Sequence, residues 1–354
     1  MLPVNAKATA VIFRQLFDNA SSTYSYLLAS RRGGEALIID PVLEKVDRYL
    51  QLLNELDLRL VKAVDTHMHA DHITGLGALR DRTHCITVMG EQSKADIVSM
   101  RLAEGEKLEI EGVSLDVIYT PGHTDDSYSF IMPDRVFTGD TLLIRGTGRT
   151  DFQNGDARAQ YESIFNRLLR LPDSTLVFPA HDYKGDTVST IGEEKAFNPR
   201  LRVKSPEEYV DLMSNLHLPS PKMMDVAVPA NMHLGLAQDE IAQRGWALTP
   251  SDAIALIGRS EVAFVDLRER SELERNGEIP GSLHAPYPAL QENVSREGIL
   301  RDLAGTKRIV FYCAFGERSA MAVQAAQDAG LSSACHIHGG FAAWKAAHGP
   351  VSRG

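Results

Sequence analysis

The stretch Thr66-His67-Met68-His69-Ala70-Asp71-His72 places four potential metal ligands within six residues. It follows the short aliphatic run Leu60 to Val64, which predicts a buried strand. A bend at the end of a strand can turn alternating side chains toward one point, whereas a single helix could not present all four to the same ion. The stretch therefore predicts a metal site at the carboxyl end of a strand.

Three more potential ligands each follow an apolar run of β type. They are His123 in PGHT (121–124), Asp140 in TGD (138–140) and His181 in PAH (179–181). An isolated histidine near a strand end is usually a surface or core residue. Seven ligand-type groups at strand ends are better explained by one metal site at the rim of the sheets.

The remainder of the first 200 residues predicts a mixed α/β fold. Apolar residues at helical spacing between residues 43 and 56 predict a helix that ends near Asp57, and a second helix is expected over 157–171. Strands are expected at 9–17, 24–29, 35–39, 60–64, 85–89, 107–119, 127–132, 135–137 and 175–178. This order favours two sheets packed face to face and covered by helices.

The chain has 354 residues, which predicts two domains. Prolines interrupt the segment between Ser205 and Gln243, so we predict a first domain over 1–204, a linker with a connecting helix over 205–245, and a second domain over 246–354. In the second domain, helices are expected at 250–257 and 319–329, and strands at 262–266, 308–312 and 335–337. Such alternation implies a parallel sheet with helices on both faces.

Composition and charge exclude several classes of protein. The formal net charge of −10, without a block of Lys or Arg, disfavours a nucleic-acid partner. No apolar run reaches the roughly 18 residues needed to span a bilayer, and the start of the chain lacks the pattern of a secretory signal. Three scattered cysteines make a poor disulfide framework. We therefore expect a cytoplasmic protein with reduced thiols and no membrane partner.

The four histidine and aspartate motifs together resemble the signature of metallo-β-lactamase-fold hydrolases, over about residues 8 to 200. The resemblance implies an N-terminal αββα sandwich with the metal at one edge of the two sheets. Hydrolases of the glyoxalase II type bind two zinc ions and cleave acylglutathione thioesters such as hydroxyacylglutathione. In such an enzyme the first metal would be held by His67, His69, His123 and Asp140, and the second by Asp71, His72, Asp140 and His181.

The chain also resembles a second group, the ETHE1-like persulfide dioxygenases. This resemblance includes further runs beyond the metal motifs, at residues 142–153, 181–183, 187–190 and 198–200. This resemblance implies one non-haem Fe(II) per chain, held by His67, His123 and Asp140. Two histidines and one carboxylate leave positions open for a substrate sulfur and O2. The implied reaction converts glutathione persulfide, O2 and water into sulfite and glutathione. The remaining ligand-type residues would then orient the iron ligands from outside: His69, Asp71, His72 and His181.

Glutathione is an anion, so its carboxylates need cationic and hydroxyl partners. Residues that closely follow the metal motifs are the candidates for this contact: Arg145, Tyr183, Lys184, Asn198 and Arg200. Arg149 is expected to brace the loop that carries Asp140.

A reactive cysteine is predicted in the second domain. The strand 308–312 leads into Cys313-Ala314-Phe315-Gly316-Glu317-Arg318-Ser319, directly before a helix. Backbone N–H groups of a tight loop and of a helix N-terminus stabilise a thiolate. Cys85 and Cys335 have no such setting and are expected to be packing residues.

The pattern C-x-x-G-x-R resembles the active-site loop of rhodaneses, supported by runs at 265–269, 279–282 and 339–344. The resemblance spans about residues 248 to 348. It implies an α/β rhodanese domain in which Cys313 carries sulfur as a persulfide and Arg318 helps to bind an anionic donor such as thiosulfate, with glutathione or sulfite as acceptor.

Three functions are compatible with these patterns. The favoured one is a bifunctional persulfide dioxygenase and thiosulfate sulfurtransferase. The second is a binuclear zinc thioesterase with a sulfurtransferase domain, and the third is a protein whose rhodanese domain only senses persulfide. The intact Cys313 loop disfavours the third, and a homodimer is compatible with the resemblance.

Overall fold

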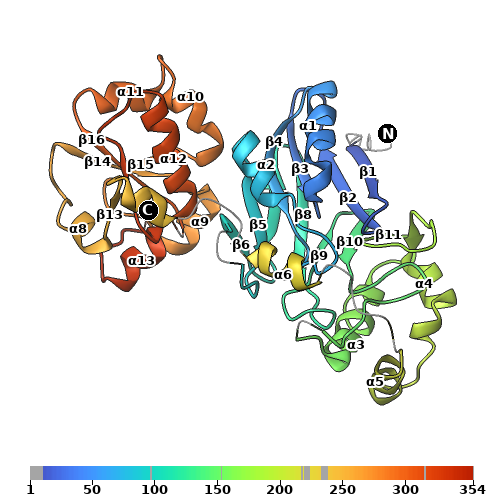
Figure 1. The fold of residues 1–354 in the computed structure, drawn as a ribbon. Coiled ribbons are helices and arrows are strands. Elements are labelled where there is room, and N and C mark those ends of the chain that lie inside the picture. Colours follow the sequence, from blue (N-terminus) through green and yellow to red (C-terminus); the bar gives the residue numbers. More distant parts are fainter. Residues whose placement is uncertain are drawn as a thin grey trace, which may run out of the picture. The chain divides into compact units, whose positions relative to one another are not determined.

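The computed structural model describes residues 11–95, 98–152, 154–216, 218, 224–232, 238–314 and 316–353 (Figure 1). The chain forms two compact units. The first comprises residues 1–83, 87–95 and 101–233, and the second comprises 84–86, 96–100 and 234–354. Of the helices in the described part of the chain, none is both long and apolar enough to cross a membrane.

The first unit contains two six-stranded sheets. One has the strand order β1-β2-β3-β4-β5-β6, in which β3 and β4 are parallel while β1, β2 and β3 run antiparallel. Its strands are β1 (Ile12–Asp18), β2 (Thr23–Ala29), β3 (Glu35–Ile39), β4 (Arg59–Val64), β5 (Ile86–Gly90) and β6 (Met100–Leu102).

The other sheet has the order β12-β11-β10-β9-β8-β7, with a parallel pair at β10 and β11. Its strands are β7 (Lys107–Ile110), β8 (Val113–Tyr119), β9 (Tyr128–Ile131), β10 (Arg135–Gly139), β11 (Leu176–Pro179) and β12 (Ser189–Thr190). Aromatic side chains pack between the two sheets: Tyr26 on β2 lies 5.0 Å from Phe137 on β10, and Phe13 on β1 lies 4.9 Å from Phe178 on β11, measured between ring centroids.

Helices cover the outer faces of both sheets. Helix α1 (Val46–Glu55) buries Val46, Tyr49, Leu52 and Leu53, and it lies with α2 (Leu76–Thr83) along the first sheet (Figure 1). A separate core joins β10 and β11 to α3 (Ala157–Phe165), α4 (Ile191–Phe197) and α5 (Pro206–Ser214). This arrangement confirms the predicted αββα sandwich. The remaining elements of the unit are η1 (Leu43–Lys45), η2 (Leu168–Arg170), η3 (Pro199–Leu201) and α6 (Met224–Met232).

The second unit is built on a five-stranded sheet, β13-β17-β16-β14-β15, in which every neighbouring pair is parallel. The strands are β13 (Ala247–Leu248), β14 (Val262–Asp266), β15 (Leu283–His284), β16 (Arg308–Tyr312) and β17 (Cys335–Ile337). Its helices are α7 (Gln238–Gln243), α8 (Pro250–Ile254), α9 (Arg270–Asn276), η4 (Tyr287–Ala289), α10 (Leu290–Val294), α11 (Ile299–Ala304), α12 (Glu317–Asp328) and α13 (Gly340–Ala346).

Strand β16 shows how this sheet is buried on both sides. Ile309 and Phe311 join a core with α7, α10, α11 and α12, while Val310 and Tyr312 join another with α8 and α13. Successive side chains of a strand point to opposite faces, so helices must cover both. The predicted parallel sheet with helices on both faces is confirmed.

Several element predictions differ from the structure. The run 107–119 is a hairpin of two strands, and the helix expected over 157–171 ends at Phe165 before η2. The segment 205–245 begins with α5, whose buried Tyr209 and Met213 belong to the core of the first unit. The boundaries 1–204, 205–245 and 246–354 stay a prediction. The predicted Gln153, Phe315 and Pro219-Ser220-Pro221 features lie outside the described residues.

Candidate metal centre and sulfur-transfer loop

Three of the predicted ligands meet at the carboxyl ends of strands in the first unit. His67 follows β4, His123 follows β8 and Asp140 follows β10. One potential ligand atom from each lies within 4.8 Å of the others. His123 Nε2 is 3.6 Å from Asp140 Oδ2, and the rings of His67 and His123 are 5.0 Å apart. The structure therefore brings together the three residues that the sequence nominated as iron ligands.

Hydrogen bonds orient both histidine rings so that Nε2 is the available nitrogen. His123 Nδ1 lies 2.7 Å from the carbonyl oxygen of Arg149, and His67 Nδ1 lies 2.9 Å from Thr66 Oγ1. The Thr66 hydroxyl donates to Asp40 at 3.1 Å, which leaves its oxygen to accept from His67. Such outer partners select the tautomer and direction of a metal-binding imidazole.

Close packing holds the loop that carries Arg149 against the site. A Cβ added to Gly148 would lie 2.2 Å from the Asp140 carbonyl oxygen and 2.8 Å from His123 Nδ1, so only glycine allows this approach. The Arg149 side chain pairs with Asp151 and lies 3.9 Å over the Phe152 ring. The residue thus contributes to the site through its backbone carbonyl.

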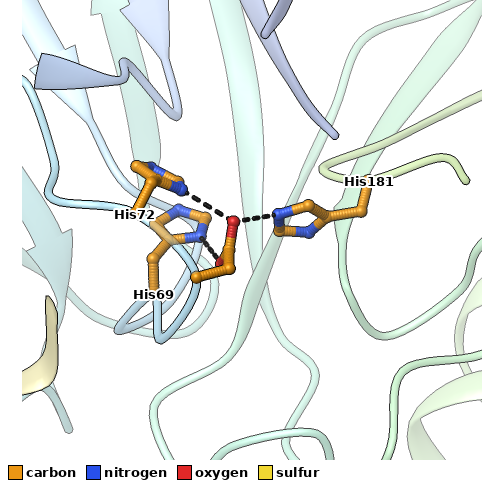
Figure 2. A group of neighbouring side chains, drawn as sticks. His69, His72 and His181 are labelled. Atoms are coloured by element: carbon orange, nitrogen blue, oxygen red, sulfur yellow. Dashed lines mark hydrogen bonds and ion pairs between the residues drawn. The ribbon is translucent and has the colours of Figure 1, made fainter. Parts of the chain in front are cut away.

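A second group of ligand-type residues lies beside the first. Figure 2 shows His69, His72 and His181 converging on one carboxylate, which belongs to Asp71. Its Oδ2 lies 3.0 Å from His72 Nδ1 and 2.8 Å from His181 Nε2, while its Oδ1 is 4.0 Å from His69 Nδ1. This group could also enclose a cation.

His181 links the two groups directly. Its Nδ1 lies 2.7 Å from Asp140 Oδ1 and its Nε2 lies 2.8 Å from Asp71 Oδ2. Burial alone would lower the pKa of His181, but Asp140 and Asp71 outweigh it and hold that pKa well above its usual value. Burial opposes ionisation of Asp140 too, yet His181, His123 and His67 hold its pKa below the usual range. A hydrogen-bonded imidazolium between two carboxylates is the arrangement that these contacts favour.

The donor atoms present fit a metal ion. His69 Nδ1 and His72 Nε2 are buried and have no hydrogen-bond partner among the described residues. Burial and neighbouring histidines lower the pKa of His67 and of His69 well below the usual value, so both rings are neutral and have a lone pair to offer. Buried polar atoms without partners are costly unless an ion or water completes them. Imidazole nitrogens and carboxylate oxygens suit Fe(II) or Zn(II).

Like Asp40, two further residues that support the site were not predicted from the sequence. Thr23, at the start of β2, is fully buried, and its hydroxyl lies 3.1 to 3.2 Å from His181 Nε2, His72 Nδ1 and Asp71 Oδ2. Asn231, on α6, accepts a hydrogen bond from Thr74 N (2.9 Å) and donates to the carbonyl oxygens of His69 (3.0 Å) and His72 (2.9 Å). No local pattern marks either residue.

We expect Asn231→Ala to weaken metal binding by about ten- to a hundredfold, because three backbone groups of the 69–74 loop lose their partner in a buried place. Competition with a chromophoric Fe(II) chelator under anaerobic conditions measures the affinity. Asn215→Ala, which removes an exposed amide at the end of α5, is the control. Equal affinities for the two variants would contradict a role for Asn231 in holding the loop.

The five candidates for glutathione contact separate into two sets. Arg145 and Asn198 converge on the buried Glu194: Arg145 N donates at 2.9 Å and Asn198 Nδ2 at 2.8 Å. Asn198 Nδ2 also donates to Gly146 O at 2.9 Å and Arg200 donates to Thr147 O, so the contacts of these three residues hold the 145–147 loop in place. Tyr183 is 69% exposed, with its ring parallel to that of His181 at 6.1 Å.

Lys184 is also exposed, and its N–H donates to Asp182 Oδ2 at 2.8 Å. Exposed side chains can bind a ligand from solution. Arg145 is less available, because its side chain is 29% exposed and already forms an ion pair with Glu194. Tyr183 and Lys184 are therefore the candidates that stay most available to a ligand.

In the second unit, Cys313 follows β16 and is buried at the start of a tight loop. Its Sγ accepts a hydrogen bond from Gly316 N at 3.2 Å. Gly316 has a φ of +95° and caps α12, and a Cβ there would lie 2.1 Å from Gln238 Oε1. Gln238, which the sequence did not nominate, accepts from Gly339 N at 2.8 Å and so packs beside the loop.

Arg318 does not lie open to solvent. It is fully buried and forms a bidentate ion pair with Glu272 on α9, at 2.8 and 2.7 Å. The carboxylate of Glu272 therefore largely neutralises the charge of the Arg318 guanidinium. Cys85 and Cys335 are buried and form no disulfide, and Cys335 Sγ contacts the Ile309 carbonyl oxygen at 3.6 Å.

Comparisons with known proteins cover both units. The Metallo-beta-lactamase superfamily model matches residues 18–97 and 90–181, and the Rhodanese-like domain model matches residues 249–347. The mouse protein "Persulfide dioxygenase ETHE1, mitochondrial" is 46% identical over 235 residues, which are 66% of this chain and 92% of the mouse protein. The chain belongs to the ETHE1 persulfide dioxygenase family. It is an enzyme of that family with an additional rhodanese sulfurtransferase domain.

Solved structures agree with this assignment. The crystal structure of ETHE1 from Myxococcus xanthus is 54% identical and covers 62% of this chain and 98% of that one, with a TM-score of 0.61. A metallo-beta-lactamase structure from Staphylococcus aureus is 21% identical and covers 93% of this chain and 98% of that one, with a TM-score of 0.59. The latter supports the fold over nearly the whole chain of this ETHE1 family member.

Proposed function

We propose that this ETHE1 family member oxidises glutathione persulfide with O2 and passes sulfane sulfur through Cys313. In the first reaction, glutathione persulfide, O2 and water give glutathione, sulfite and two protons. The terminal sulfur loses four electrons, which O2 accepts, and sulfite receives two oxygen atoms from O2 and one from water. In the second reaction, Cys313 takes sulfane sulfur from a donor such as thiosulfate and transfers it to glutathione or sulfite.

The observation that carries the proposal is the His67, His123 and Asp140 triad. Protein partners occupy Nδ1 of both histidines, so two Nε2 atoms and one carboxylate oxygen face a common point. Three such ligands on one face suit one non-haem Fe(II) and leave positions for sulfur and O2. When bound, the iron would supply the redox chemistry between the persulfide sulfur and O2.

The surrounding residues have roles that follow from their contacts. His181, paired with Asp71, would hold a proton beside Asp140 and keep that carboxylate oriented. Thr23 and Asn231 fix the same loop. We assign the glutathione contact first to Tyr183 and Lys184, because both are exposed, while Arg145, Asn198 and Arg200 would shape the adjoining 145–147 loop.

The two activities are chemically complementary. Sulfite, the proposed product of the oxidation, is a sulfane-sulfur acceptor, and a persulfide is a sulfane-sulfur carrier. We infer that the protein works in sulfide or thiosulfate metabolism. A cytoplasmic location, where the three thiols stay reduced, belongs to this proposal.

Oxygen uptake tests the proposal. The anaerobically iron-loaded full-length protein is mixed with glutathione persulfide in an oxygen-electrode cell, and metal content is determined on the same sample. We expect uptake of one O2 per sulfite formed, with about one iron per chain. No uptake from a fully iron-loaded sample would overturn the dioxygenase assignment.

A second candidate function is a binuclear zinc thioesterase of the glyoxalase II type. The observation that favours it is the group His69, Asp71, His72 and His181, whose ligand atoms lie within 4.8 Å of one another. Such an enzyme would bind two zinc ions per chain and hydrolyse an acylglutathione without O2. The metal ratio and the oxygen trace of the same experiment distinguish the two.

A further inference from the structure

A buried polar chain lies behind Cys313, beyond the residues of the rhodanese motif. Ser319 on α12 is fully buried, and its Oγ lies 3.7 Å from Cys313 Sγ. The same oxygen lies 3.1 Å from Nδ1 of His336, which is also fully buried. The thiol, hydroxyl and imidazole side chains are thus linked in the order Cys313, Ser319, His336.

The strand period explains why His336 points toward this chain. Cys335 and Ile337, its neighbours on β17, pack into the core shared with α8 and α13. His336 therefore faces the opposite side of the sheet, where Cys313 packs with α12. The placement depends on the parallel pairing of β16 with β17.

The surroundings of His336 select one tautomer. Its Nε2 is buried and has no hydrogen-bond partner among the described residues. A buried N–H without an acceptor is costlier than a bare lone pair, so the hydrogen belongs on Nδ1. Burial, together with His338, lowers the pKa of His336 to about 4, which keeps the ring neutral. His336 Nδ1–H therefore donates to Ser319 Oγ.

This donation restricts the hydroxyl hydrogen of Ser319. Because Ser319 Oγ accepts from His336, its own hydrogen is directed to another acceptor. In the thiol form of Cys313, the Ser319 hydroxyl donates to the Gly316 carbonyl oxygen at 3.0 Å, while the Cys313 thiol donates to Ser319 Oγ at 3.7 Å. A thiolate is a stronger acceptor than a neutral carbonyl, so the hydrogen turns to sulfur when Cys313 ionises.

We propose that Ser319 and His336 are positioning residues for sulfur transfer, in which His336 orients the Ser319 hydroxyl so that it stabilises the Cys313 thiolate. This inference rests on the sulfur transfer assigned above to Cys313. In that step the thiolate attacks the outer sulfur of thiosulfate, the S–S bond of the donor breaks, and sulfite leaves with the bonding electrons. Cys313 then carries a persulfide anion. Attack by an acceptor thiolate or by sulfite on its outer sulfur returns the thiolate.

Two other groups near Cys313 differ from the Ser319 hydroxyl in this respect. Arg318, the neighbouring cation, is paired with Glu272, so its field at Cys313 is reduced. The N–H of Gly316 reaches Cys313 Sγ at 3.2 Å and is present in every variant considered below. The Ser319 hydroxyl is therefore the contribution that can be removed separately.

The thiol pKa of Cys313 tests the proposal without any turnover. Thiolate absorbance near 240 nm is titrated for full-length variants, each referenced to its own Cys313→Ser derivative. We expect Ser319→Ala to raise the pKa by about one unit and His336→Leu by about half a unit. Ser319→Thr keeps the hydroxyl and His336→Asn keeps a donor near the Nδ1 position, so both should titrate like the parent protein. In the double variant Ser319→Ala/His336→Leu, the pKa should equal that of Ser319→Ala alone.

Two results would overturn the proposal: an unchanged pKa in Ser319→Ala, or a His336→Leu shift that is equally large with and without Ser319. If Ser319→Ala does not fold, the comparison of His336→Leu with His336→Asn decides, since both keep Cys313 and Ser319. Thiosulfate sulfurtransfer is assayed separately. If the parent protein shows no sulfurtransfer while the variants show the expected shifts in the Cys313 pKa, the proposed function of Cys313 is refuted. The role of Ser319 and His336 in stabilising the thiolate is then still supported.

Discussion

Replacing Cys313 by serine is expected to lower thiosulfate sulfurtransfer by at least about a thousandfold, because a serine hydroxyl is not ionised at neutral pH and cannot carry sulfane sulfur. Oxygen uptake with glutathione persulfide should stay within about twofold of the parent value, since the candidate metal ligands all lie in the first unit. Sulfite release from thiosulfate and an oxygen electrode measure the two activities on one preparation.

Cys335→Ser is the matched control for this variant. Cys335 is also a buried thiol, on the strand next to the one that leads to Cys313, but it packs in the core shared with α8 and α13. Burial raises the pKa of the Cys335 thiol, which makes it a poor nucleophile. The control should keep most of its sulfurtransfer. Sulfurtransfer that survives in Cys313→Ser and disappears in Cys335→Ser would reverse the assignment.

Replacing His123 by alanine should reduce bound iron to less than about a tenth per chain and lower oxygen uptake by at least about a thousandfold. The variant loses one of three candidate ligands and also the hydrogen bond that ties the ring to the Arg149 carbonyl oxygen. Sulfurtransfer by Cys313 should persist, because its loop belongs to the second unit. Metal analysis after anaerobic loading and oxygen uptake give the result.

His348→Ala, which removes an exposed histidine of the second unit, is the control for general effects of losing an imidazole. It should bind iron and consume oxygen like the parent protein. A His123→Ala protein with one iron per chain and parental oxygen uptake would exclude His123 as a ligand and leave the neighbouring group of His69, Asp71, His72 and His181 as the metal site.

Local patterns in the sequence were enough to predict many of the strands and the positions of the candidate site residues. The strands β3, β14, β16 and β17 have the predicted bounds, because each is a continuous run of mainly apolar residues of strand length. The convergence of His67, His123 and Asp140 was also predictable, since each comes shortly after a strand and strand ends gather at one rim. The position of Cys313 between a strand and a helix was predictable for the same reason, because the strand, the loop and the helix N-terminus are consecutive in the chain.

Only the tertiary structure revealed the partners of these residues. Asn231 lies 157 positions from Thr74, and Thr23 lies 158 positions from His181, so no local period relates them. His336 reaches Ser319 only because β17 pairs with β16, and Arg318 on α12 is paired with Glu272 on α9, 46 positions away. The sequence by itself determined which side chains could do chemistry. Only the tertiary structure decided which of these side chains are held in one orientation, which charges are paired, and which groups stay exposed to a ligand. These properties depend on contacts between segments that are far apart in sequence.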